Sequence, residues 1–295
     1  MVFPPGNSAR ILERGGEVVS AESVARVLGN APNRLLVSAS NGRRYVLKLY
    51  SDRDRDQALL RESLGTELAA SLGLPVPRWG PVYVSNDFIT AFSRIWTKQR
   101  PSAGYYFGSE MLGQDAGDRV CDYLPKTWLH KIENRSDFIG ALMLDIWANN
   151  ARSRQAIFFQ KTNSAMFRAV FIGFREMFSS RVDYSSSAIP GRYCHGHIYD
   201  ECWNESAFSF WQRKILSLRE TRLRGLLLQL PSVWINREDV DQIISRLLAN
   251  QKMIKRLQFH SFDPRSQPWD HPGGGLSNPT NPPLRRNLIR VAFGM

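Results

Sequence analysis

The sequence predicts an α+β fold in which a small β-rich region is followed by a mainly helical one. In the first third of the chain, short runs of β-favouring residues alternate with turn signals, and only one long helix is expected. After about residue 113, apolar residues recur mainly at helical spacing. We therefore expect a β-rich domain over residues 1–113, a mainly helical domain over residues 114–262, and a flexible Pro/Gly-rich tail over residues 263–295.

The β-rich region contains a predicted hairpin. Residues 34–38 and 45–49 are rich in β-favouring side chains, and the Asn41-Gly42 pair between them is the strongest short signal for a two-residue turn. A charged stretch follows, and then leucines at helical spacing predict a helix through residues 59–69.

Proline ends that helix, because it cannot continue the helical hydrogen-bond ladder and stands twice in Gly73-Leu-Pro-Val-Pro77. Two further strands are expected, at residues 82–84 and 88–92, where Val, Tyr, Phe, Ile and Thr predominate.

The second region contains mostly helices. Asn134 is placed to cap a helix whose apolar stripe extends to residue 147. Residues 157–159 and 167–172 predict a pair of strands around a polar turn. Two helices are expected after them, one over residues 206–228 and one beginning at Asn236.

Composition restricts the partners and the cellular compartment. The 295 residues include 39 Lys and Arg against 27 Asp and Glu, a net charge of +12 that suits an anionic partner such as a nucleotide, a nucleic acid or an acidic protein. No apolar run reaches the roughly 18 residues of a membrane span, so no membrane insertion is expected. Three cysteines (Cys121, Cys194 and Cys202) are too few for a disulfide scaffold, and the chain begins without a secretory pattern. We expect a cytoplasmic protein.

Lys48 is the most informative single residue, because it stands between Leu47 and Leu49 in a strand that is expected to be buried. A buried ammonium group needs a partner of opposite charge, and Glu62 on the following helix is the candidate. A strand lysine held by a helix glutamate binds the nucleotide phosphates in kinases. The alternative is an edge-strand lysine that points into water.

Several sequence blocks around this pair resemble the HipA-like kinase family, over roughly residues 28–258. They occur in the family's order: Tyr45-Val-Leu-Lys48-Leu with Arg61-Glu62-Ser-Leu-Gly65 and Leu72-Gly-Leu-Pro-Val-Pro77, then Phe107-Gly-Ser-Glu, Val120-Cys-Asp-Tyr-Leu-Pro125, Asp137 to Trp147, and Arg154-Gln-Ala-Ile-Phe158. The resemblance implies a bilobed protein-kinase-like fold, with a small β-rich N-lobe and a mainly helical C-lobe. It also implies binding of ATP with Mg²⁺ and phosphate transfer to a protein Ser or Thr.

The sequence departs from the family at its acidic positions. The family has a catalytic aspartate in an Asn-x-Asp segment, where this chain reads Asn150-Ala151-Arg152. The family's metal-binding aspartate lies in an Ile-Asp-x-Gly segment, where Gly173 stands here. Ile157 occupies the slot of the metal-binding asparagine, five residues after Arg152.

These departures remove what phosphoryl transfer requires, namely a carboxylate to orient the nucleophile and ligands for Mg²⁺. An arginine at about 4 Å from a metal charge adds roughly 4 kcal/mol of repulsion at an effective dielectric near 20. We therefore expect Mg²⁺ binding to be weak or absent and predict no metal site. A guanidinium group can nevertheless hold phosphate directly.

The leading hypothesis is a HipA-like pseudokinase, or a much weakened kinase, that binds ATP or another phosphate ligand. The nucleotide-binding residues would be Lys48, Glu62, Asn150 and Arg152. One alternative is an active Ser/Thr kinase that uses displaced acids, namely Asp145 or Glu176. The other is a basic module that binds nucleic acid or an unidentified protein and takes no nucleotide.

Four other features are better explained as ordinary structure than as sites. The loop Gly29-Asn-Ala-Pro-Asn-Arg34 lacks a glycine-rich phosphate-binding pattern. Cys194, His195, His197 and Cys202 match no common zinc spacing. The basic residues on the helix expected at 206–228 suit a solvated face or a nucleic-acid surface: Arg213, Lys214, Arg219, Arg222 and Arg224. Trp203, Trp211 and Trp234 are expected in the core.

Overall fold

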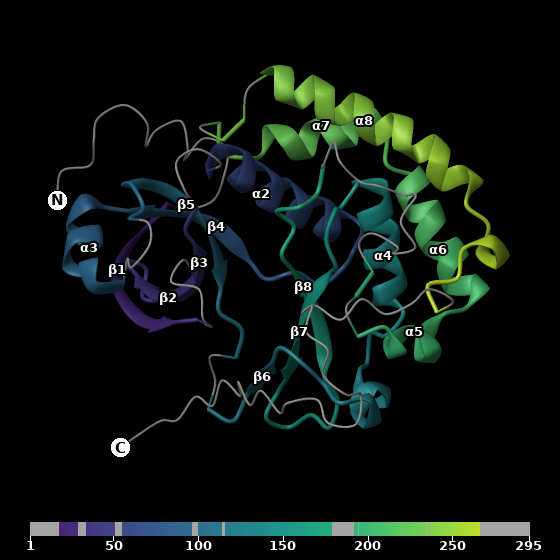
Figure 1. Cartoon of the computed structure of the whole chain (residues 1–295), viewed down its shortest axis with the longest axis horizontal. Helices are drawn as coiled ribbons and strands as arrows, with labels where there is room; N and C mark the ends of the chain where they lie inside the picture. The colour runs from purple at the N-terminus through teal and green to yellow at the C-terminus, as the bar shows by residue number, and fades with distance from the viewer. Residues whose placement is uncertain are drawn as a thin grey trace, which may run out of the picture.

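The computed structural model describes residues 18–28, 34–50, 55–95, 100–113, 116–178, 192–193, 195–232, 234–235 and 237–265. A β-barrel lies on one side of the molecule and most of the helices lie on the other, with helix α2 and a second sheet between them (Figure 1). The predicted α+β fold, with its β-rich part first and its helical part second, is confirmed.

The barrel has five strands in the order β1-β2-β3-β5-β4, closed by a parallel pairing of β1 with β4. The predicted hairpin is present as β2 and β3, and Gly42 in its turn has a φ of +75°. The first and last of the five strands in the chain were not expected from the sequence. The strands are β1 (Val19–Val27), β2 (Arg34–Ala39), β3 (Arg44–Lys48), β4 (Trp79–Val84) and β5 (Gly104–Glu110).

Alternation along β3 decides where its lysine points. Tyr45 and Leu47 are buried in the barrel core, so Val46 and Lys48 lie on the outer surface. This outer surface faces helix α2 (Arg55–Ser71), which runs between the barrel and the helical region (Figure 1). Helix α2 ends as predicted before the proline segment, with Gly73 in a left-handed conformation at φ +83°.

The strand predicted at residues 88–92 is wrong, because the structure has a helix there, α3 (Asn86–Ala91). The Ser85 side chain accepts a hydrogen bond from the Phe88 backbone N–H, which caps the helix, and Asp87 lies in its first turn. Phe88 and Ile89 still reach the barrel core, so burial alone did not distinguish helix from strand.

The other half of the molecule contains a second sheet, with the strand order β6-β7-β8 and antiparallel pairing throughout. Its strands are β6 (Arg119–Cys121), β7 (Gln155–Gln160) and β8 (Arg168–Ile172); β7 and β8 correspond to the predicted pair. Helix α4 (Asp137–Trp147) packs beside it. Asn134 does not cap α4 as predicted, because its amide exchanges hydrogen bonds with the backbone of Ala169 on β8.

The prediction of a single helix over residues 206–228 is wrong, because the chain forms two helices there, separated by a break that begins at Ser217. The side-chain amide of Gln251 donates to the carbonyls of Ile215 and Leu218, which compensates the backbone groups freed at the break. The helices of this part are α5 (His197–Cys202), α6 (Glu205–Leu216), α7 (Glu220–Leu228) and α8 (Arg237–Arg256). Short 3₁₀ turns are η1 (Ser93–Ile95), η2 (Lys126–Lys131) and η3 (Phe259–Ser261).

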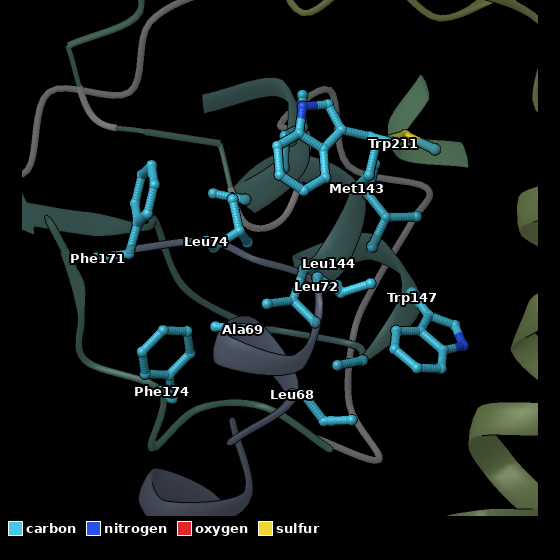
Figure 2. Packing of buried hydrophobic residues seen from close by; sticks show 14 of the residues in the cluster. Leu68, Ala69, Leu72, Leu74, Met143, Leu144, Trp147, Phe171, Phe174 and Trp211 are labelled. Atoms are coloured by element: carbon cyan, nitrogen blue, oxygen red, sulfur yellow. The ribbon is translucent and has the colours of Figure 1, made fainter. Parts of the chain in front are cut away.

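The largest buried cluster joins the end of α2 to α4 and β8. Figure 2 shows Leu68 and Ala69 from α2 near Met143 and Leu144 from α4, with Phe171 from β8 at the edge of the group. Trp203, Trp211 and Trp234 are buried, as predicted. Within the described part of the chain, no helix combines the length and the apolar character that crossing a bilayer requires.

Candidate functional site

The ammonium group of Lys48 contacts the carboxylate of Glu62 at the junction of β3 and α2. Lys48 Nζ lies 2.5 Å from Glu62 Oε1, and their side chains are 18% and 2% exposed. The predicted pairing is confirmed. The cost of removing both charges from water makes this pair sensitive to any movement of α2.

Gly65 sets how closely α2 approaches the other half of the molecule. A Cβ atom at this position would lie 2.4 Å from Phe174 Cβ and 2.8 Å from Met177 Sδ. Helix α2 therefore contacts the turn at residues 174–177 directly. The contact is at Gly65, three residues after Glu62, whose side chain pairs with Lys48. Only glycine permits this approach without displacing the helix or the turn.

Hydrogen bonds join the loop that carries Arg152 to the segment that contains Gly173. The loop after α4 carries Arg152, and its Ala151 N–H donates to the Glu176 carbonyl at 3.1 Å. The side chain of Arg154, from the same loop, donates to the Gly173 carbonyl at 3.1 Å. Arg152 is exposed, and its side chain contacts no hydrogen-bonding partner among the described residues.

Asp145 is held by Arg154 in a buried, two-pronged ion pair. Arg154 Nε donates to Asp145 Oδ2 at 2.8 Å, a second guanidinium nitrogen donates to Oδ1, and Asn150 Nδ2 adds a bond of 3.0 Å. Burial raises the pKa of Asp145, while Arg154 and Asn150 oppose that shift. Asp145 is fully buried and fixes the loop, which gives it a structural role and does not favour it as a substitute metal ligand.

The backbone at Gly173 is itself suited to glycine. Its φ is +78°, and a Cβ there would lie 2.9 Å from Gln155 Oε1. The positive φ and the nearby Gln155 side chain both favour glycine at this position.

Sequence reasoning missed Tyr50 and Arg175, which meet beside the Lys48–Glu62 pair. The Arg175 guanidinium carbon lies 5.2 Å from the centre of the Tyr50 ring. Tyr50 Oη and Glu62 Oε2 are both buried and have no hydrogen-bond partner in the described structure. Burial and then the charge of Glu62 raise the pKa of Tyr50 well above its ordinary value. The sequence signal that could have found them is proximity along the chain: Tyr50 lies two residues after Lys48, and Arg175 lies two residues after Gly173.

The fold resembles that of solved kinases. A crystal structure of the Helicobacter pylori proinflammatory kinase CtkA matches with a TM-score of 0.53 and 10% identity, covering 81% of this chain and 97% of CtkA. HipA of Shewanella oneidensis MR-1, solved with HipB and operator DNA, gives 0.48 and 10%, covering 79% and 66%. Golgi casein kinase with Mn and ADP gives 0.47 and 10%, covering 80% and 71%. The chain has a protein-kinase-like fold. No family model and no curated protein matches its sequence.

The side chains at positions 152, 157 and 173 supply no oxygen ligand for a divalent metal. Arg152 is a cation, Gly173 has no side chain, and Ile157 on β7 offers no ligand atom. Glu176 is partly exposed and lies 3.5 Å from Arg175, so it is the acid that stays accessible near the altered positions. No group of three or more metal-ligating side chains occurs among the described residues. Cys194 and the loop at residues 29–33 lie outside them.

The basic residues of the predicted 206–228 helix are divided by the break between α6 and α7. Lys214 donates to the Leu72 carbonyl at 2.7 Å, and Arg224 pairs with Glu220 and Asp241. The remaining three cations are exposed: Arg213, Arg219 and Arg222. A nucleic-acid surface here stays a prediction, now based on fewer free charges.

Proposed function

We propose that this chain is a HipA-like pseudokinase that binds a nucleotide through Lys48 and does not transfer its phosphate efficiently. The observation that carries the proposal is the contrast between two halves of one site. The Lys48–Glu62 pair is assembled at 2.5 Å, while Arg152 and Gly173 stand where the family's two acids belong. The order of the family-like sequence blocks supports the HipA-like assignment.

The residues present would act on the ligand by binding and orientation. Lys48, held in place by Glu62, would contact oxygens of the nucleotide phosphates. The exposed guanidinium of Arg152 would bind phosphate directly, and Asn150, which is fixed to Asp145, would hold the loop that presents it. Position 152 carries an arginine and no carboxylate, so no group there can accept the proton of an attacking hydroxyl. The protein therefore orients phosphate without promoting its transfer.

The binding test is a thermal-shift titration with ATP, in EDTA and in Mg²⁺. At about 100 times the dissociation constant, ATP stabilises the native state by about 2.7 kcal/mol, which corresponds to roughly 5–10 °C. We expect Lys48→Met to lose most of this shift and Lys252→Met, an exposed lysine on α8, to keep it. Absence of any shift for the unmodified protein refutes nucleotide binding and favours the basic interaction module.

The transfer test is autophosphorylation with radiolabelled ATP. We expect no label above that of Lys48→Met. Strong labelling that Lys48→Met abolishes would instead establish an active kinase. A Glu176→Gln variant would then decide whether the accessible acid near Arg175 supplies the chemistry.

A further inference from the structure

Cationic side chains gather around the end of β3. In the register of the β2–β3 hairpin, Arg34 lies directly opposite Lys48, so the two side chains share the outer surface of the barrel. Like charges in this position destabilise a strand pair. An anion bound between them would offset that repulsion.

Arg175 brings another positive charge from the opposite half of the molecule. Its guanidinium lies over the ring of Tyr50, two residues after Lys48. The charges of Arg175 and Arg34 both lower the pKa of Tyr50, against the larger effect of burial. Arg175 is about half exposed, and its 3.5 Å contact with Glu176 leaves the guanidinium able to turn toward a ligand.

Lys48's partner Glu62 and the nearby Tyr50 each have one buried polar atom without a hydrogen-bond partner among the described residues. These atoms are Tyr50 Oη and Glu62 Oε2. A buried hydroxyl without a partner is costly, and a leucine-like or phenylalanine side chain would avoid the cost. An anion bound at this place could accept a hydrogen bond from the Tyr50 hydroxyl and so remove that cost.

We propose that Arg34, Arg175 and the Tyr50 hydroxyl complete, together with Lys48, a site for the phosphate chain of a nucleotide bound without a divalent metal. This proposal rests on the proposed function and names the groups that replace the metal's charge. Guanidinium groups bind phosphate oxygens in a fixed, two-pronged geometry. Two acids, Glu62 and Glu176, lie near this cluster. The three cations Lys48, Arg34 and Arg175 outnumber them.

The test is calorimetric titration in EDTA with ATP and, separately, with inorganic tripolyphosphate. We expect the full-length protein to bind both, because the phosphate chain is the recognised part. Arg34→Ala and Arg175→Ala should each weaken the affinity about tenfold. Tyr50→Phe should weaken it without lowering the melting temperature, since the lost hydroxyl has no partner among the described residues. Arg256→Ala, an exposed arginine in the last turn of α8, is the matched control and should bind as the parent does.

The outcomes separate this inference from the proposed function. Binding of ATP only in the presence of Mg²⁺ overturns the inference and leaves the proposed function standing. If ATP binds in EDTA and neither Arg34→Ala nor Arg175→Ala changes the affinity, the inference is likewise overturned and the proposed function stands. Failure of the unmodified protein to bind ATP in either buffer overturns both. Loss of affinity in both arginine variants at an unchanged melting temperature supports the inference.

Discussion

Replacing Gly65 by alanine tests whether the close approach of α2 to the turn at residues 174–177 holds the Lys48–Glu62 pair in place. The new Cβ would lie 2.4 Å from Phe174 Cβ, and that atom cannot swing away as the tip of a long side chain could. Overpacking a core in this way costs up to about 3 kcal/mol. The gain in helix propensity from glycine to alanine returns about 1 kcal/mol. We therefore expect Gly65→Ala to lower the free energy of unfolding by about 2 kcal/mol.

Gly225 in helix α7 supplies a control of opposite sign, because a Cβ there would meet no atom within 4 Å. Gly225→Ala should raise the free energy of unfolding by up to about 1 kcal/mol, since only the propensity changes. Urea unfolding of both variants, followed by tryptophan fluorescence, measures the difference. If Gly65→Ala proved as stable as Gly225→Ala, the helix would not be held by this contact and our account of the Glu62 position would be wrong.

Two further predictions concern buried groups. Arg154→Met leaves the Asp145 carboxylate buried without its counter-charge, so it should cost about 3–5 kcal/mol in urea unfolding. Arg168→Met breaks a pair whose arginine is 56% exposed and should cost under about 1 kcal/mol; equal losses would show that burial of the first pair has no special effect. Burial raises the pKa of Cys202 to about 12, so iodoacetamide near neutral pH should label it only after unfolding. Peptide mass spectrometry checks this, and native labelling of Cys202 as fast as that of the half-exposed Cys121 would contradict it.

Local signals predicted those elements whose residues all favour the same structure. The Asn41-Gly42 turn between β-favouring runs predicted the β2–β3 hairpin, and the leucines of α2 followed by prolines predicted that helix and its end, although α2 begins earlier, at Arg55. The same reasoning failed at residues 88–92, where β-favouring side chains are outweighed by the cap at Ser85. It also failed at the break after Leu216, because the group that satisfies the free carbonyls, Gln251, comes from another helix.

The candidate site divides in a similar way. The sequence named Glu62 as the candidate partner of Lys48, because a buried ammonium needs an acid and the following helix offers one, and it left open a lysine that points into water. The structure decided for the pair. It could not choose between Asp145 as a displaced ligand and Asp145 as a structural acid. That choice depended on Arg154, whose guanidinium meets the carboxylate only after α4 and β7 have packed.

The amino-acid sequence by itself determined the β2–β3 hairpin, the helix before the proline segment, the excess of positive charge and the absence of acids at positions 152 and 173, since these depend on residue identity and local propensity. Only the tertiary structure decided that Arg34 lies opposite Lys48, that Arg175 lies over the Tyr50 ring and that the Tyr50 hydroxyl has no partner among the described residues. Such neighbours come from separate elements, and long-range packing rather than spacing along the chain brings them together.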